Sequence, residues 1–94
     1  MMKSVLQKNR ECLLCHTTLD LHRHHCFEGS NRQASEKYGL TVYLCAKHHN
    51  MSNASVHLNE ELNREVKRWA QRKAMKYYSW TEDDFRQRFI RSYI

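Results

Sequence analysis

Two short motifs of cysteine and histidine carry the strongest chemical signal in the sequence. The first runs from Cys12 to Cys15 and the second from Cys45 to His48, each with two residues between its ends. This spacing lets two side chains bind one ion from a tight turn, and two such motifs fill the four positions of a tetrahedral site. Three thiolates and an imidazole favour zinc, whose binding stabilises small domains directly. The motifs therefore predict a structural Zn²⁺ ion.

Several of the seven histidines are placed to bind a second ion. His24 and His25 stand at the end of a predicted strand, where neighbouring side chains point to opposite faces, so that one can bind an ion while the other faces a substrate. His49 directly follows the second motif, and His57 follows a polar stretch. Three imidazoles with open water positions bind a divalent ion well, and a fourth histidine can act as a general base on water.

The remaining cysteine and histidines have simpler interpretations. Cys26 lies outside both motifs, and we expect a small buried side chain there. His16 and His22 fit no ligand spacing and are expected to be surface or structural residues. For Cys12 and Cys15 two alternatives to zinc remain open, a redox dithiol and ordinary buried cysteines. A thioredoxin-like site requires a βαβ arrangement, which the sequence does not predict.

Composition and charge favour an anionic partner. The chain has 94 residues, with 16 Lys plus Arg against 10 acidic residues, a net charge of +6 and a pI of about 9.4. Nucleic acid is the default partner for such a charge. The length predicts a single domain over residues 1–94, near the lower size limit for one apolar core. No stretch is apolar enough for a signal peptide or a membrane helix, so we expect a cytoplasmic protein without membrane association.

In the first half of the chain we expect a hairpin with a long connection. The β-branched and aromatic run Thr41–Cys45 predicts one strand, and a second strand is expected near Leu21 to Phe27. The connection is expected to hold a short helix. Ser30 would cap this helix, with Gln33 three residues later, and Gly39 would end it in a left-handed conformation.

The sequence pattern of the second half predicts helices. One apolar stripe at helical spacing predicts a long helix, and Thr81 with Asp84 three residues later predicts the capped start of another, which Phe85 and Phe89 continue. The fold class is therefore α+β: a zinc-bound ββα finger over residues 11–57, after a polar lead-in, and two helices over residues 58–94. The stripe consists of Leu62, Val66, Trp69, Ala70, Ala74 and Tyr77.

Basic side chains in both halves are candidates for contacts with phosphates. The alternative is a helix face that is merely solvated. The candidates are Arg68, Arg72 and Lys76 in the long helix, and Arg32 and Lys37 nearer the finger.

The order of these motifs resembles the HNH nucleases, also called the ββα-metal or His-Me finger superfamily, and especially the small phage-encoded HNH proteins. That family has a Cys-x-x-Cys motif, a His-His or Asp-His pair on a strand, a second strand ending in a Cys motif, and a His on a helix. The resemblance covers residues 11–57. His49 lies 24 positions after His25, the distance expected between the family's general base and its helical ligand.

The resemblance implies a metal-dependent endonuclease that hydrolyses phosphodiester bonds of double-stranded DNA, in the cytoplasm of a bacterial host if the protein is phage-encoded. It implies His25 as the general base, and His24 and His49 as ligands of a catalytic Mg²⁺, Mn²⁺ or Zn²⁺ ion. His57 and Asn53 are both candidates for the last ligand. His57 is preferred because imidazole is the stronger ligand for a transition metal, and it requires the helix to end near residues 50–52.

One position departs from the family pattern. The asparagine that orients the base in HNH nucleases should lie five residues before Cys45, where this sequence has Leu40. Asn31, in the connection between the strands, is a candidate substitute. The departure favours a rival interpretation, a zinc-stabilised nucleic-acid-binding or adaptor module without turnover. A third interpretation is a thiol redox protein.

Overall fold

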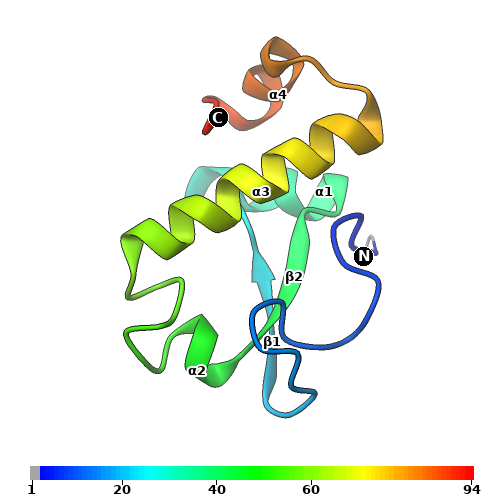
Figure 1. Cartoon of the computed structure of the whole chain (residues 1–94). Helices are drawn as coiled ribbons and strands as arrows, with labels where there is room; N and C mark the ends of the chain where they lie inside the picture. The colour runs from blue at the N-terminus through cyan, green and yellow to red at the C-terminus, as the bar shows by residue number, and fades with distance from the viewer. Residues whose placement is uncertain (1–2) are drawn as a thin grey trace.

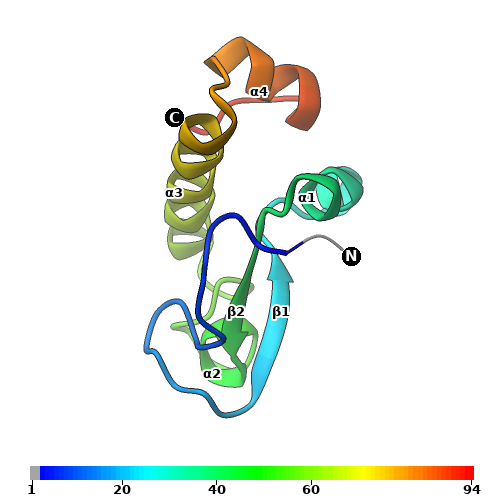
Figure 2. The ribbon, with the colours of Figure 1, turned by 90° about the vertical axis from the view of Figure 1, so that its right-hand side faces the viewer.

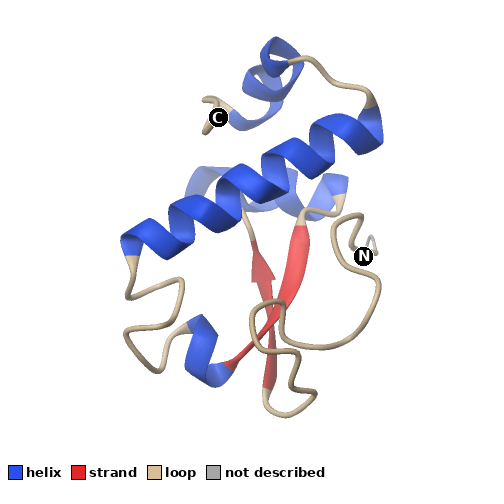
Figure 3. Cartoon of the chain, in the orientation of Figure 1, coloured by secondary structure: helices blue, strands red, loops and turns tan. Residues whose placement is uncertain are grey.

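An antiparallel hairpin and the helices around it form a mixed α+β fold, as the sequence predicted (Figure 3). The computed structural model describes residues 3–94. Its elements, in chain order, are β1 (Leu21–His25), the 3₁₀ helix η1 (Gly29–Asn31), α1 (Arg32–Tyr38), β2 (Thr41–Cys45), α2 (Ala46–His49), α3 (Glu60–Tyr78) and α4 (Glu82–Phe89).

The hairpin consists of β1 and β2, paired so that Leu21 lies opposite Cys45 and His25 opposite Thr41. Strand β2 has the predicted bounds, and β1 ends two residues before Phe27. Because successive side chains of a strand alternate between faces, the histidines of β1 are divided. His22 and His24 share one face, and His25 lies on the other.

The connection between the strands differs from the expectation at its start. The chain already turns as a 3₁₀ helix from Gly29, so Ser30 lies inside η1, and the N-cap of α1 is Asn31, without a side-chain hydrogen bond. The prediction that Ser30 caps the helix is therefore wrong. Gly39 does end α1 with φ at 72°, and a Cβ there would lie 2.5 Å from the carbonyl oxygen of Lys3.

Helix α3 packs its small and apolar residues on the hairpin, with Val66, Ala70 and Ala74 buried. The predicted stripe is wrong at its end. Tyr77 is 61% exposed, since it lies against the neighbouring ring of Tyr78 beyond the buried part of the helix. Gln71 is fully buried instead, with its amide bonded to the C-terminal segment: Nε2 donates to Ser92 Oγ, and Oε1 accepts from Tyr93 N.

Helix α4 closes one end of the core. Thr81 and Asp84 form the predicted capping box, and the rings of Phe85 and Phe89 stack with centroids 4.7 Å apart. Both rings also contact Phe27, just beyond β1, at 5.3 and 5.0 Å. All three side chains are fully buried, so α4 is attached through aromatic packing to the chain that follows β1.

The helices cover different sides of the hairpin (Figure 1). Figure 2 shows α3 and α1 on opposite sides of the strands, with α2 at one end of the hairpin and α4 near the other. The N-terminal segment is more than the expected polar lead-in. Leu6 is buried in the core, and Gln7 Oε1 accepts a hydrogen bond from Tyr43 N at 2.8 Å, so this segment lies along β2. Within residues 3–94, no helix has the length and apolar character to cross a membrane.

Candidate metal centres

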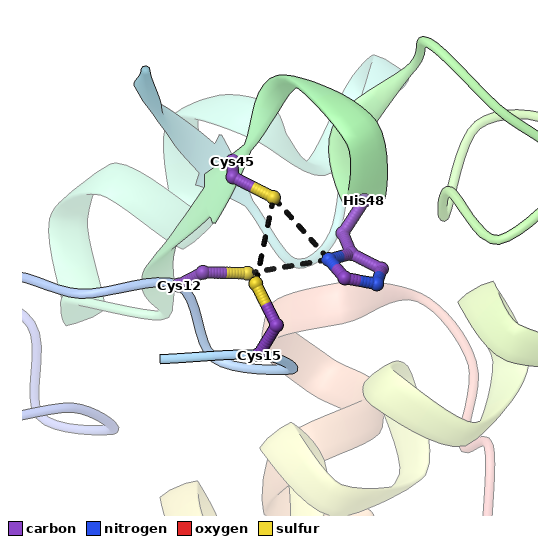
Figure 4. Close-up of side chains that lie close together, drawn as sticks. All are labelled: Cys12, Cys15, Cys45 and His48. Carbon is purple, nitrogen blue, oxygen red and sulfur yellow. Dashed lines mark hydrogen bonds between the residues drawn. The ribbon is translucent and has the colours of Figure 1, made fainter. Parts of the chain in front are cut away.

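Four side chains from the two sequence motifs converge at the α2 end of the hairpin (Figure 4). Cys15 Sγ lies 3.7 Å from Cys45 Sγ, and His48 Nδ1 lies 3.7 Å from Cys12 Sγ and 3.2 Å from Cys45 Sγ. A tetrahedral ion with bonds of about 2.3 Å to sulfur and about 2.1 Å to nitrogen separates two sulfurs by about 3.8 Å, and sulfur from nitrogen by about 3.6 Å. This group could therefore hold a metal ion with little rearrangement.

Backbone contacts fix the loop that carries the first motif. Leu13 N donates to Tyr43 O at 2.9 Å and Ala46 N donates to Asp20 O at 3.1 Å, so the loop is bonded to the hairpin on both sides. Burial alone would raise the pKa of Cys12, but backbone hydrogen bonds to its sulfur, that from Cys45 the largest, lower the pKa to about 6. Cys12 thus favours the thiolate, the form that binds metal. The pKa of Cys15 is raised instead. A backbone hydrogen bond at Thr17 lowers it, but desolvation and the neighbouring thiols of Cys12 and Cys45 together outweigh that effect.

Cys26 has the role expected from the sequence. It is fully buried and belongs to neither metal-binding group. Burial raises the pKa of its thiol, so Cys26 is a small, inert core residue. All four cysteines are free thiols.

Three imidazoles form a second group that could hold a metal ion: His24 of β1, His49 of α2 and His57 of the following turn. Their donor atoms all lie within 4.8 Å of one another. The Nε2 atoms of His49 and His57 are 3.0 Å apart, and the ring centroid of His24 lies 5.4 and 5.3 Å from theirs. His24 is 3% exposed, so the group is anchored in the core and open to solvent on the His57 side.

The end of α2 explains why His57 joins this group. The helix stops at His49, with Asn50 as its C-cap. The chain then folds back, so that His57 N donates to His49 O at 3.2 Å. Asn53 lies exposed in this turn, where its carbonyl oxygen accepts from Asn59 Nδ2 at 3.2 Å. Of the two candidates for the last ligand, the fold places His57 beside His49.

The surroundings of His24 and His49 disfavour the charged form of both rings. Burial lowers the pKa of His24 to about 4. The pKa of His49 is also lowered, first by burial and then by the neighbouring His57 and His22. Neutral imidazole is the form that binds metal ions, so these ligands are available at neutral pH.

His22 was expected from the sequence to be a surface or structural residue rather than a ligand, and the structure places it against the second group. Its Nδ1 lies 2.9 Å from Nδ1 of His49. A hydrogen bond to the nitrogen that does not bind the ion fixes the orientation and tautomer of a ligand histidine. A signal was present in the sequence, because residues two apart on a strand share a face, and His22 is two residues before His24.

His25 lies on the other face of β1, away from the three imidazoles. Its Nε2 is 3.1 Å from Oε1 of Glu36, which also pairs with both terminal nitrogens of Arg23 at 2.8 and 2.7 Å. Hydrogen bonds from Arg23 and His25 lower the pKa of Glu36 to about 2. With an ionised acceptor on Nε2, the imidazole of neutral His25 carries its proton there and keeps its lone pair on Nδ1.

Leu40, at the position where the HNH pattern has an asparagine, and Asn31, its candidate substitute, have other roles. Leu40 is fully buried in the core, and the amide of Asn31 donates to Phe89 O at 3.0 Å. Asn31 therefore binds the end of α4, and its amide is not free to orient His25. Glu36 contacts His25 instead. The sequence could not indicate this contact, since it depends on how α1 crosses the hairpin.

Positive charge gathers beside the N-terminal segment, in a hollow of about 510 Å³. None of its lining residues within the described chain is acidic, and Arg10 lies over the ring of Tyr43. The basic residues that line it are Lys3, Lys8, Arg10 and Arg23.

The basic residues predicted from the sequence lie elsewhere on the surface. Arg68 is engaged within the protein, where its Nε donates to Tyr93 O at 3.1 Å and its Nη1 pairs with Glu65 at 2.7 Å. The others are exposed and free to meet solvent or an anion: Arg32, Lys37, Arg72 and Lys76.

Comparisons with protein-family models, with curated proteins and with solved structures find no match to this chain. The features of this chain that bear on its function are therefore the two groups that could hold metal ions, the contacts of His25 and the distribution of charge.

Proposed function

We propose that this chain is a metal-dependent endonuclease of the HNH type, which hydrolyses phosphodiester bonds of double-stranded DNA. The observation that carries the proposal is the three-imidazole group built from β1, α2 and the following turn. It combines a buried ligand, His24, with an exposed one, His57. A catalytic ion requires such a site, because it must be held by the protein and also be open to a substrate.

The first group is proposed to hold a structural Zn²⁺ ion. Its three sulfurs and one nitrogen are the donor set of closed zinc sites, in which no position is left for a substrate. Free thiolates of this kind suit a reducing cytoplasm, where we place the protein.

In the second group His24, His49 and His57 would hold a divalent ion, Mg²⁺, Mn²⁺ or Zn²⁺. When bound, such an ion stabilises the charge that develops on the phosphate and on the leaving oxygen. The low pKa values of His24 and His49 keep both rings in the ligating form. His22 would hold the ring of His49 in place.

His25 is proposed as the general base. Glu36 accepts from Nε2, which leaves Nδ1 to take a proton from water, and the carboxylate then stabilises the imidazolium that forms. Because His25 faces away from the three imidazoles, the scissile phosphate must lie across the end of β1, within reach of both faces. Glu36 would thus orient the base in place of the family's asparagine.

The charge of the chain supports DNA as the substrate. Phosphate contacts by Lys and Arg supply most of the sequence-independent affinity for DNA. The net charge is +6. Of the four basic residues that line the hollow beside β2, Arg23 pairs with Glu36, and Lys3, Lys8 and Arg10 form no ion pair within residues 3–94.

Plasmid nicking with Mg²⁺ or Mn²⁺ tests the proposal, together with metal analysis of two variants. His25→Ala should abolish nicking and retain both ions, because a general base contributes to turnover and not to ligation. His49→Ala should lose the second ion and keep the Zn²⁺ ion. His16→Ala is the control, since the side chain of His16 is exposed and, within residues 3–94, pairs with Glu11 alone. A His25→Ala protein that nicks at the parental rate contradicts the mechanism.

The second candidate function is a zinc-stabilised DNA-binding or adaptor module. The burial of Leu40 at the asparagine position and the outward direction of His25 favour it. This candidate predicts that the parent binds DNA and one Zn²⁺ ion but nicks with neither Mg²⁺ nor Mn²⁺.

A further inference from the structure

Two buried polar atoms without a hydrogen-bond partner face each other next to the three imidazoles. They are Nε2 of His24 and Oε2 of Glu28, 3.9 Å apart. A buried polar atom that is left unpaired is costly, and native proteins rarely leave one without a reason. Two such atoms pointing at one another indicate a place for a group that would satisfy both.

The other oxygen of Glu28 is held by α3. Oε1 lies 3.1 Å from Nζ of Lys67 and 3.3 Å from Nδ2 of Asn63. The side chain of Lys67 is 17% exposed, so this pairing is shielded from solvent. Lys67 and Asn63 thus fix the carboxylate with one oxygen paired and the other directed toward His24.

The separation of the two unpaired atoms fits a shared metal ion. Two donors that bind one ion with bonds of about 2.1 Å cannot be more than about 4.2 Å apart, and at tetrahedral angles they are about 3.4 Å apart. The observed 3.9 Å between Glu28 and His24 lies within this limit. It is too long for a hydrogen bond, so an ion explains the arrangement better than a direct contact of the carboxylate with the imidazole. Glu28 does not belong to the group of donor atoms that all lie within 4.8 Å of one another, so its free oxygen must also turn toward His49 and His57 to share their ion.

We infer that, when an ion binds at His24, His49 and His57, the free oxygen of Glu28 turns toward it and becomes a further ligand. The inference rests on the proposed function only in requiring an ion at these histidines. A carboxylate changes the chemistry of the site, because imidazole alone suits zinc-like ions, whereas carboxylate oxygens suit Mn²⁺ and Mg²⁺. Glu28 would therefore determine which ions the site accepts.

The test is the affinity of the second site for Mn²⁺ and for Co²⁺, in protein that already holds one Zn²⁺ equivalent. Glu28→Gln keeps the size of the side chain and removes its charge. We expect the Mn²⁺ affinity to fall by at least about tenfold, the Co²⁺ affinity to fall by a smaller factor, and the visible spectrum of bound Co²⁺ to change. A purely structural role for Glu28 would not alter the preference between the two ions.

Glu82→Gln is the matched control. Glu82 also pairs with a basic residue, Arg86 at 2.6 Å, and is 41% exposed against 37% for Glu28. Glu28→Asp keeps the charge but shortens the side chain, so it should bind Mn²⁺ with an affinity between those of the parent and Glu28→Gln. Melting of the zinc-loaded variants checks that they are folded.

The outcomes separate this inference from the nuclease proposal. Unchanged Mn²⁺ affinity and Co²⁺ spectrum in Glu28→Gln, or a parent that binds no second ion, would overturn the inference. A parent whose second ion depends on Glu28 but which never nicks DNA would overturn the nuclease proposal alone.

Discussion

The histidines of the hairpin differ in what holds their rings. His22 and His49 meet through their Nδ1 atoms, His24 faces the free oxygen of Glu28, and His25 is bonded to Glu36. A ring nitrogen held by a neighbour fixes the tautomer and direction of the other nitrogen. The residues around each imidazole therefore separate ligands from the proposed base, although His24 and His25 are adjacent in the sequence.

Replacing Glu36 with Gln tests its role as the positioning residue for His25. The amide keeps a hydrogen-bond acceptor but loses the charge that would stabilise the imidazolium. We expect kcat for nicking to fall by about 10- to 100-fold, with the KM for DNA and the content of both ions unchanged. Glu82→Gln, on α4, should retain parental kcat. A Glu36→Gln variant with parental kcat would show that Glu36 only forms an ion pair with Arg23 and does not position His25.

Glu36 also predicts a pH dependence of stability. Its pKa in the folded protein is about 2, below its ordinary value of 4.5, because Arg23 and His25 stabilise the carboxylate. A lowered pKa contributes stability that is fully present above pH 4.5 and is lost as the pH falls toward 2. Denaturant unfolding should therefore show that the difference in free energy of unfolding between the parent and Glu36→Gln shrinks as the pH falls from about 5 to about 2.5. A difference that stays constant would contradict the ion pair.

At the scale of elements, the one-turn helix α2 connects the two metal centres. Consecutive residues of a helix are about 100° apart around its axis, and this places His48 against the cysteines and His49 against the other histidines. Strand β2 brings Cys45 to the start of the same helix. An ion bound at the first group would thus fix the helix that carries His49, a candidate ligand of the second group.

Removing a ligand from the first centre should therefore unfold the finger. Cys45→Ser is expected to lose the structural ion and cooperative melting, because structural zinc contributes roughly 10 kcal/mol or more to small domains. Cys26→Ala is the control, as Cys26 is buried but belongs to neither group. It should keep the ion and still melt cooperatively. Metal analysis and circular dichroism measure both effects. A Cys45→Ser protein with parental melting would contradict the structural role.

Local signals in the sequence predicted the elements, and contacts between distant segments decided the rest. The β-branched run of β2, the left-handed Gly39 and the capping box at Thr81 depend only on neighbouring residues, and all three are confirmed. The contacts of Glu28 with α3 and of Glu36 with His25 require the packed fold. The sequence analysis therefore found the candidate ligands and missed the carboxylates beside them.

On the scale of the whole molecule, the basic residues divide into two sets. Arg23 and Lys67 are paired with carboxylates and largely shielded from solvent, and Arg86 is paired with Glu82 on the surface of α4. Within the described chain a second set forms no ion pair and remains available to an anion: Lys8 and Arg10 at the hollow, and Arg72 and Lys76 on α3. Unpaired positive charge thus lies beside β2, along the exposed side of α3, and at Arg32 and Lys37 of α1.

DNA binding should weaken steeply with salt, and the two regions can be compared by neutralisation. For duplex DNA the slope of log K against log salt changes by about 0.9 for each phosphate contact. Lys8→Gln with Arg10→Gln should flatten the slope by about 2. The triple variant Arg68→Gln, Arg72→Gln, Lys76→Gln should flatten it by no more than that, although it removes one charge more, because Arg68 is already bonded to Glu65 and Tyr93.

The measurement is binding of a short duplex across a range of salt concentrations, with cleavage prevented by His25→Ala in every protein. Sequence should matter little, since phosphate contacts carry no sequence information. Arg86→Gln is the control, because Arg86 pairs with Glu82 and Asp83 on α4. Flattening in the Lys8 and Arg10 variant alone would place the duplex against the hollow and leave the α3 residues as a solvated face. A slope unchanged in both variants would remove both regions from the DNA interface.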